Sequence, residues 1–220
     1  MIPVDPAPEP AGFDRRVRQR GLSALAELVG ESPPESRRGP RRIKIAESRD
    51  TLRSADYPAF WVEMLDELAH AYNRVCAYSA FHIHPVTGSP TVDHFVPKTA
   101  DWRLAYEWSN YRLACGVMNA RKSDSSVVLD PFEIEDGWFE MEFVAFQVVP
   151  GSKLDPGIRL KVHATIRQLG LSDPLLCTVR EAYVAEYLAG LIPLQRLESH
   201  APFVARELRR QGLLLPEDTR

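Results

Sequence analysis

The hydrophobic positions of this chain follow two spacings, one typical of amphipathic helices and one typical of strands. Apolar residues recur at helical intervals from Arg16 to Val29 and from Pro58 to Val75, where a proline stands at the expected helix start. The same spacing predicts further helices nearer the end of the chain, over 157–169, 173–188 and 203–211. Short β-type runs predict strands over 91–96 and 110–114 and a β-structured segment over 139–149, and a short helix is expected over 117–122.

These elements predict an α+β fold that is mostly helical, with an additional short β-hairpin after the central strands. We expect three regions along the chain. Residues 1–54 form an extended and helical arm with a basic linker, residues 55–150 form the central domain, and residues 151–220 form a helical region suited to docking a partner.

Composition and charge exclude several classes of protein. The formal net charge is −3, so any nucleic-acid surface must be a local patch. The three cysteines are too few for a secreted disulfide framework, and no apolar run approaches the roughly 18 residues that span a bilayer. The start of the chain lacks the pattern of a signal peptide, and we expect a cytoplasmic protein without a membrane association.

A broken basic cluster lies in the polar segment between residues 30 and 54. Its members are Arg37, Arg38, Arg41, Arg42 and Lys44. Such a cluster is either a solvated linker or a flexible arm that contacts a phosphate backbone, and the sequence leaves both open.

Four polar residues in the central region form a combination that carries chemistry. Asp93 and His94 lie on the first expected strand, Asn110 opens the second, and Asn119 lies near the start of the short helix. Each alone has an ordinary explanation, since an asparagine often caps a helix or forms a turn and a strand histidine is usually structural. In order and spacing, however, the combination resembles the HNH nuclease motif over residues 76–124, which implies a ββα-metal finger embedded in the helical domain.

The resemblance assigns roles that suit the residue types. Asp93 and Asn119 offer hard oxygen ligands for Mg²⁺ or Mn²⁺, His94 acts as general base on water, and Asn110 fixes the loop and the orientation of the histidine. Phosphate contacts are expected from three basic residues, Lys98, Arg121 and Lys122.

Many HNH relatives brace this finger with zinc held by two Cys-x-x-Cys knuckles, and here both knuckles are incomplete. The corresponding pairs are Cys76 with Ser79 and Cys115 with Met118. Serine and methionine do not replace thiolates at structural zinc, so we expect a degenerate, metal-free knuckle in which these residues pack. A mixed zinc site that recruits His82 or His84 is the alternative.

The segments 1–22 and 129–143 also look like the HNH proteins similar to PtuB, the nuclease component of Septu-type antiphage defence, which work beside an ABC-type or SMC-like ATPase. The leading hypothesis is therefore a metal-dependent DNA endonuclease with an ATPase partner. The alternative is an inactive HNH fold that binds nucleic acid or the ATPase. A zinc hydrolase of another class is excluded by the lack of a His-Glu-x-x-His ligand set.

Overall fold

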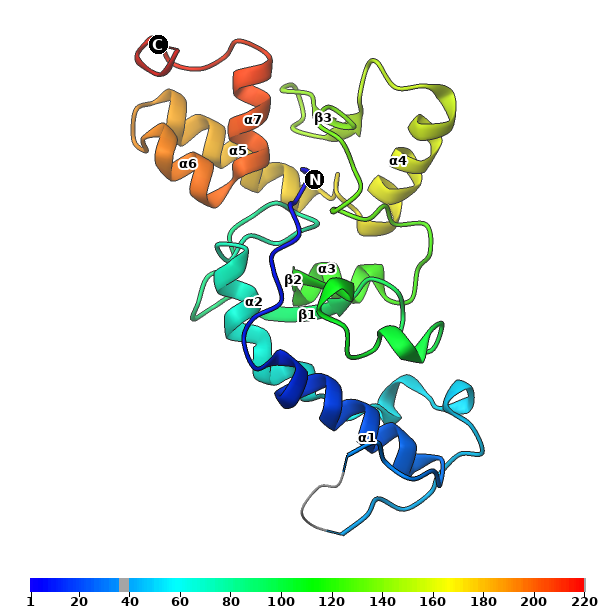
Figure 1. The fold of residues 1–220 in the computed structure, drawn as a ribbon. Helices are drawn as coiled ribbons and strands as arrows, with labels where there is room; N and C mark the ends of the chain where they lie inside the picture. The colour runs from blue at the N-terminus through cyan, green and yellow to red at the C-terminus, as the bar shows by residue number, and fades with distance from the viewer. Residues whose placement is uncertain (36–39, 220) are drawn as a thin grey trace. The chain divides into compact units, whose positions relative to one another are not determined.

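The computed structural model describes residues 1–35 and 40–219 and has an α+β fold of helices and two small two-stranded sheets (Figure 1). The predicted α+β class is confirmed. Arg37 and Arg38 of the basic cluster lie outside the described residues. In the described part of the chain, every helix is too short or too polar to cross a membrane.

The chain divides into two compact units that are each built from separate segments. Unit 1 comprises Met1–Asp5, Tyr72–Pro90 and Ala114–Arg220, and unit 2 comprises Pro6–Ala71 and Thr91–Leu113. These units do not follow the boundaries at residues 54 and 150 that the sequence suggested, because segments far apart in sequence pack together.

Unit 2 contains the first helices and most of the first sheet. Its elements are a π-helical turn Asp14–Arg18, α1 Gln19–Leu28, a 3₁₀ segment Phe60–Met64, α2 Leu65–Ala71, and the greater part of strands β1 Pro90–His94 and β2 Tyr111–Cys115. Strands β1 and β2 pair, and a hydrogen bond of 2.9 Å from Phe95 N to Asn110 O continues the pairing beyond the end of β1. The predicted strands are thus present, with bounds that differ by one or two residues from those expected.

Aromatic side chains form the core of unit 2. The ring of Phe13 packs edge-on against Trp108 and Tyr111, with centroid distances of 5.7 and 5.8 Å. Helix α1 approaches Tyr106 closely at Gly21, where an added Cβ would lie 2.3 Å from the Tyr106 ring. This glycine therefore sets how near α1 can pack to the loop that precedes β2.

Unit 1 contains the remaining helices and the second sheet. Its elements are α3 Gly116–Lys122, β3 Phe139–Met141, β4 Val148–Pro150, α4 Pro156–Leu169, α5 Pro174–Leu188, α6 Leu194–His200 and α7 Pro202–Arg210. Strands β3 and β4 pair antiparallel with Met141 opposite Val148, which confirms the predicted hairpin. Asp155 caps the start of α4 and Asp173 caps the start of α5, each by accepting hydrogen bonds from backbone N–H groups. A proline follows each cap as the first helical residue, which is typical of a helix start.

Two expectations about the helices need correction. The helix expected over 58–75 begins as a 3₁₀ segment and α2 ends at Ala71, since Asn73 and Arg74 take positive φ values of 49° and 57°. Helix α6 was not predicted, and it packs with α5 and α7 in unit 1 (Figure 1).

Candidate functional site

Asp93 and His94 end strand β1 in unit 2 and are both buried. Asp93 is 3% exposed and His94 is 9% exposed. The Nε2 atom of His94 lies 2.9 Å from the carbonyl oxygen of Ala105. A carbonyl oxygen only accepts hydrogen bonds, so Nε2 carries the proton and donates it. With Nε2 as the donor, general base catalysis by this imidazole would require an unprotonated Nδ1.

Aromatic rings fix the orientation of the His94 imidazole. Trp61 meets it edge-on at 4.6 Å between ring centroids, and Tyr111 does so at 5.1 Å. The Tyr111 hydroxyl donates to the same Ala105 oxygen at 3.0 Å, so that oxygen accepts from two side chains. No sequence motif indicates these contacts, because Trp61 lies far from His94 along the chain.

Asn110 closes the loop between β1 and β2 with its side-chain amide. Its Oδ1 accepts from Val96 N at 2.8 Å, and its Nδ2 donates to Val96 O and Leu104 O at 3.0 Å each. Leu104 directly precedes Ala105, whose carbonyl oxygen accepts from His94. The Asn110 amide thus closes the loop beside that carbonyl, and its positioning role stays a prediction.

Lys98 lies in the same loop region as His94. Its Nζ lies 4.5 Å from the centroid of the Trp61 ring, the ring that also contacts His94. Its backbone is held by the Tyr57 hydroxyl, which donates to Lys98 O at 2.9 Å. A half-buried lysine beside a candidate base is well placed to meet a phosphate.

Asn119, Arg121 and Lys122 lie on α3 and belong to unit 1. Arg121 forms a salt bridge with Asp173 at 3.0 Å and donates to Leu169 O and Gly170 O at 3.1 and 3.2 Å. Its guanidinium thus ties α3 to the turn between α4 and α5. Lys122 is 0% exposed, and its Nζ lies 3.5 Å from Ser123 O. Burial argues against the direct phosphate contact expected for Lys122.

The residues of the degenerate knuckle also lie in unit 1. Cys76, Ser79 and Met118 are buried, and Cys115 is partly exposed. Cys115 N donates to Cys76 Sγ at 3.4 Å. The thiols interact as a pair, in which the hydrogen bond to Cys76, together with burial, raises the pKa of Cys115. Burial alone would raise the pKa of Cys76, but hydrogen bonds from Cys115 and Ser79 outweigh it and lower that pKa.

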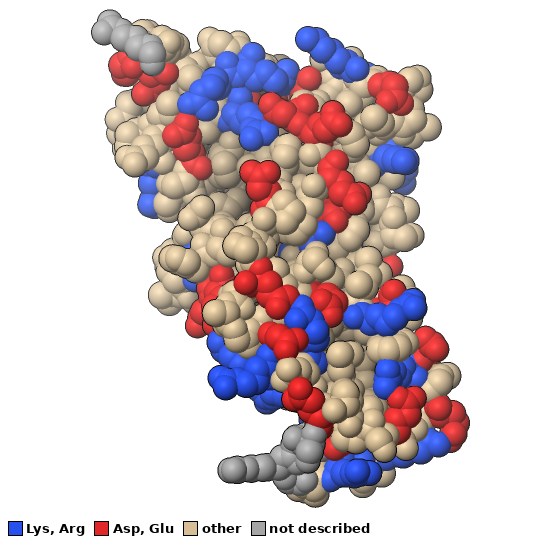
Figure 2. All heavy atoms as spheres, in the orientation of Figure 1, with Lys and Arg blue, Asp and Glu red and all other residues tan. Residues whose placement is uncertain are grey.

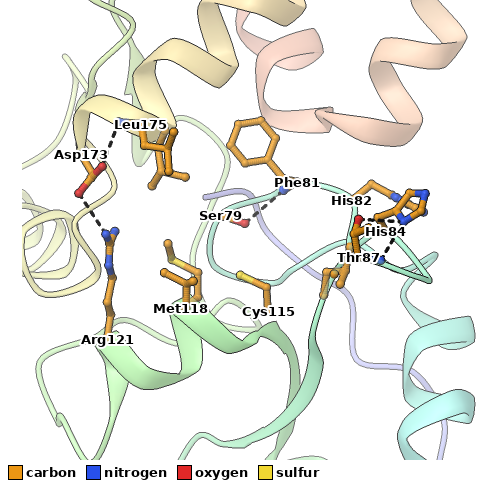
Figure 3. A pocket seen from close by; sticks show the side chains of 14 residues that line it. Ser79, Phe81, His82, His84, Thr87, Cys115, Met118, Arg121, Asp173 and Leu175 are labelled. Carbon is orange, nitrogen blue, oxygen red and sulfur yellow. Dashed lines mark hydrogen bonds and ion pairs between the residues drawn. The ribbon is translucent and has the colours of Figure 1, made fainter.

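A cavity of about 340 Å³ lies beside this knuckle (Figure 3). Its lining includes Cys115, Met118, Phe81 and Leu175, so it is mainly apolar. His84 faces it but uses Nδ1 to accept from Val86 N and Thr87 N at 3.2 and 3.1 Å. Nδ1 of His84 is therefore already engaged in hydrogen bonds within the turn 84–87.

Across residues 1–35 and 40–219, no group of three or more histidine, cysteine or acidic residues could hold a metal ion. The geometry gives no support to a mixed cysteine and histidine zinc site, and the metal-free knuckle stays a prediction. Magnesium is a different case, because it takes one or two protein oxygens and completes its shell with water and substrate phosphate. The Asp93 carboxylate and the Asn119 amide oxygen have the donor chemistry for such an ion.

No family model matches the chain, and no curated protein matches it.

Proposed function

We propose that the protein is a metal-dependent endonuclease of the HNH type that hydrolyses phosphodiester bonds in DNA. The observation that supports the proposal is the orientation of His94. Its Nε2 donates to Ala105 O at 2.9 Å and its ring contacts Trp61 and Tyr111 edge-on, so the imidazole is held in one orientation, and we assign Nδ1 as the base. A ββα-metal finger formed by β1, β2 and α3 is the arrangement that this proposal requires.

In the proposed reaction, Nδ1 of His94 accepts a proton from a water molecule whose oxygen attacks phosphorus. The bond from phosphorus to the 3′ oxygen breaks, and the leaving oxygen takes a proton from solvent water, so the products are a 5′ phosphate and a 3′ hydroxyl. Lys98 supports this step by offering positive charge to a phosphate oxygen. Asn110 acts through the loop, since its Nδ2 donates to Leu104 O, next to Ala105.

Asp93 and Asn119 would hold Mg²⁺ or Mn²⁺ in the proposed enzyme. Such an ion supplies Lewis acidity where negative charge develops on the phosphate and on the leaving oxygen. Both side chains contribute oxygen atoms, the ligand type that these hard cations prefer.

An ABC-type or SMC-like ATPase partner and a role in antiphage defence belong to the same proposal. They rest on the resemblance of the segments 1–22 and 129–143 to PtuB-like proteins. A nuclease that shares a compartment with the chromosome must be restrained, and a regulating partner provides that restraint. Co-purification with the product of a neighbouring ATPase reading frame is the direct measurement.

The second candidate is a nucleic-acid or ATPase-binding module without catalytic activity. It is favoured by the burial of Asp93 and Lys122, since a metal ligand and a phosphate contact both need access to substrate. The orientation of His94 favours the enzyme, because a binding module has no need for a histidine held as a base.

Cleavage of supercoiled plasmid in Mg²⁺ tests the proposal. We expect nicking that EDTA abolishes and that falls by about 100-fold or more in His94→Ala, the range that general base catalysis contributes. Asp93→Ala and Asn119→Ala should lose activity with it. His163→Ala on α4 is the matched control, because this histidine is exposed, and it should retain activity. Full activity in His94→Ala would refute the enzyme assignment.

A further inference from the structure

Two stacked pairs of rings lie next to each other in unit 1. The imidazoles of His82 and His200 stack with centroids 4.5 Å apart and planes inclined by 29°. The neighbouring residue Phe81 stacks on Tyr183 of α5 at 6.0 Å and 20°. His82 N donates to His200 O at 2.9 Å, so the backbone fixes the histidine pair to the end of α6. All four rings are partly exposed, and the Arg180 guanidinium lies 5.9 Å from the centroid of the Phe81 ring.

Positive charge surrounds the histidine pair. Burial, followed by the charges of His200, Arg74 and Arg196, lowers the pKa of His82. Burial and then Arg196 lower the pKa of His200. The guanidinium of Arg74 is held in place through Nε, which donates to Ile83 O at 3.1 Å. Apart from burial, the groups that lower these two pKa values are arginines and other histidines.

Neighbouring groups do not cancel this charge. His84 adds a further charge when protonated, and it also lowers the pKa of His82. Glu198 on α6 forms a salt bridge with Arg209 at 2.6 Å. Burial, and to a smaller extent the charge of Glu186, raises the pKa of Tyr183, so this carboxylate acts on the Phe81–Tyr183 pair. On the face seen in Figure 2, acidic and basic residues lie interspersed.

We name as the histidine cluster the residues Arg74, His82, Arg196 and His200. We infer that the histidine cluster binds a phosphate group of a nucleic-acid strand, with Phe81 and Tyr183 as the stacking surface for a base. A phosphate would offset the repulsion that protonation of the two histidines beside Arg74 and Arg196 creates, and aromatic rings beside basic side chains are the usual recognition chemistry for single strands. The choice of a nucleic acid rests on the proposed function, whereas affinity for phosphate does not.

Histidine titrations by NMR test the phosphate site directly. We expect inorganic phosphate to raise the titration midpoints of His82 and His200 by roughly half a unit or more, because an anion stabilises the imidazolium. Sodium chloride at equal ionic strength is the reference. His163, exposed on α4, is the internal control and should titrate alike in both salts. Identical midpoints for the histidine pair in the two salts would overturn the inference.

Binding of a fluorescein-labelled single strand of roughly 12 nucleotides tests the ligand class. The assay is run in EDTA on the intact chain, so that cleavage plays no part. Arg196→Gln should weaken binding about fivefold and reduce the salt dependence by roughly 0.7 in the logarithmic slope, the value of one phosphate contact. Arg167→Gln removes the same charge from the exposed surface of α4 and should change affinity less than twofold.

The outcomes separate this inference from the proposed function. If Arg196→Gln weakens binding of the strand but the protein does not cleave DNA, the nuclease proposal is refuted and the histidine cluster is supported as a binding site. Equal effects of Arg196→Gln and Arg167→Gln overturn the assignment to nucleic acid, even where inorganic phosphate binds.

Discussion

Replacing Asn110 by alanine tests how the loop that carries His94 is held. The change removes three hydrogen bonds, those with Val96 N, Val96 O and Leu104 O. Each hydrogen bond contributes about 1 kcal/mol net, and water can reach the half-buried partners, so the larger penalty for a fully buried unpaired group does not apply. We therefore expect the free energy of unfolding of unit 2 to fall by about 3 kcal/mol.

Urea unfolding followed by tryptophan fluorescence is suited to this measurement. Trp61, Trp102 and Trp108 lie in unit 2, and Trp138 is the fourth tryptophan of the chain, so the signal comes mainly from the unit that the substitution affects. Ser109→Ala is the matched control, because this neighbour is exposed, and it should change the free energy by less than about 0.5 kcal/mol. A loss below about 1 kcal/mol in Asn110→Ala would show that the amide does not hold the loop.

Two further predictions concern packing and pH. Gly21→Ala places a methyl group 2.3 Å from the rigid ring of Tyr106, so thermal unfolding should show a loss of about 1–3 kcal/mol despite the better helix propensity of alanine. Backbone N–H groups of Gln147 and then Ala145 lower the pKa of Glu142 from its ordinary value of 4.5. The resulting stabilisation is present above pH 4.5 and is lost as the pH falls through the lowered folded pKa, and Glu142→Gln should remove this part of the acid sensitivity in urea unfolding at a series of pH values.

Local signals predicted the elements of the central region well. Strands β1 and β2 and helix α3 depend on short-range patterns, such as β-type runs and a turn-forming asparagine, and they occur where those patterns lie. Helix α6 was missed because it has seven residues and one buried leucine, Leu197, too little for a periodic signal. The helix expected over 58–75 extends beyond the observed end at Ala71, because an apolar pattern does not reveal the positive φ values of Asn73 and Arg74.

Tertiary contacts account for what the sequence did not predict at the candidate site. Asn119 and Lys122 are three positions apart on α3 and so share a face, but spacing carries no information on what covers that face. Lys122 is 0% exposed, and this burial depends on tertiary packing that no local pattern reveals. Likewise, the contact of Trp61 with His94 joins residues 33 positions apart, and no short motif contains it.

The contacts of Arg121 bear on how α3 is held without a complete zinc knuckle. In a small finger, zinc fixes the helix to the strands, and the metal is needed because the core is small. Here Arg121 reaches Asp173, Leu169 O and Gly170 O, and Gln168 Nε2 donates to Arg121 O at 2.8 Å. Helix α3 is thus anchored to α4 and α5 by a charged side chain that the sequence suggested for DNA. An arginine committed to this anchor is a poor phosphate contact, and Lys122 is buried, so Lys98 is the remaining candidate among the three basic residues that the sequence suggests.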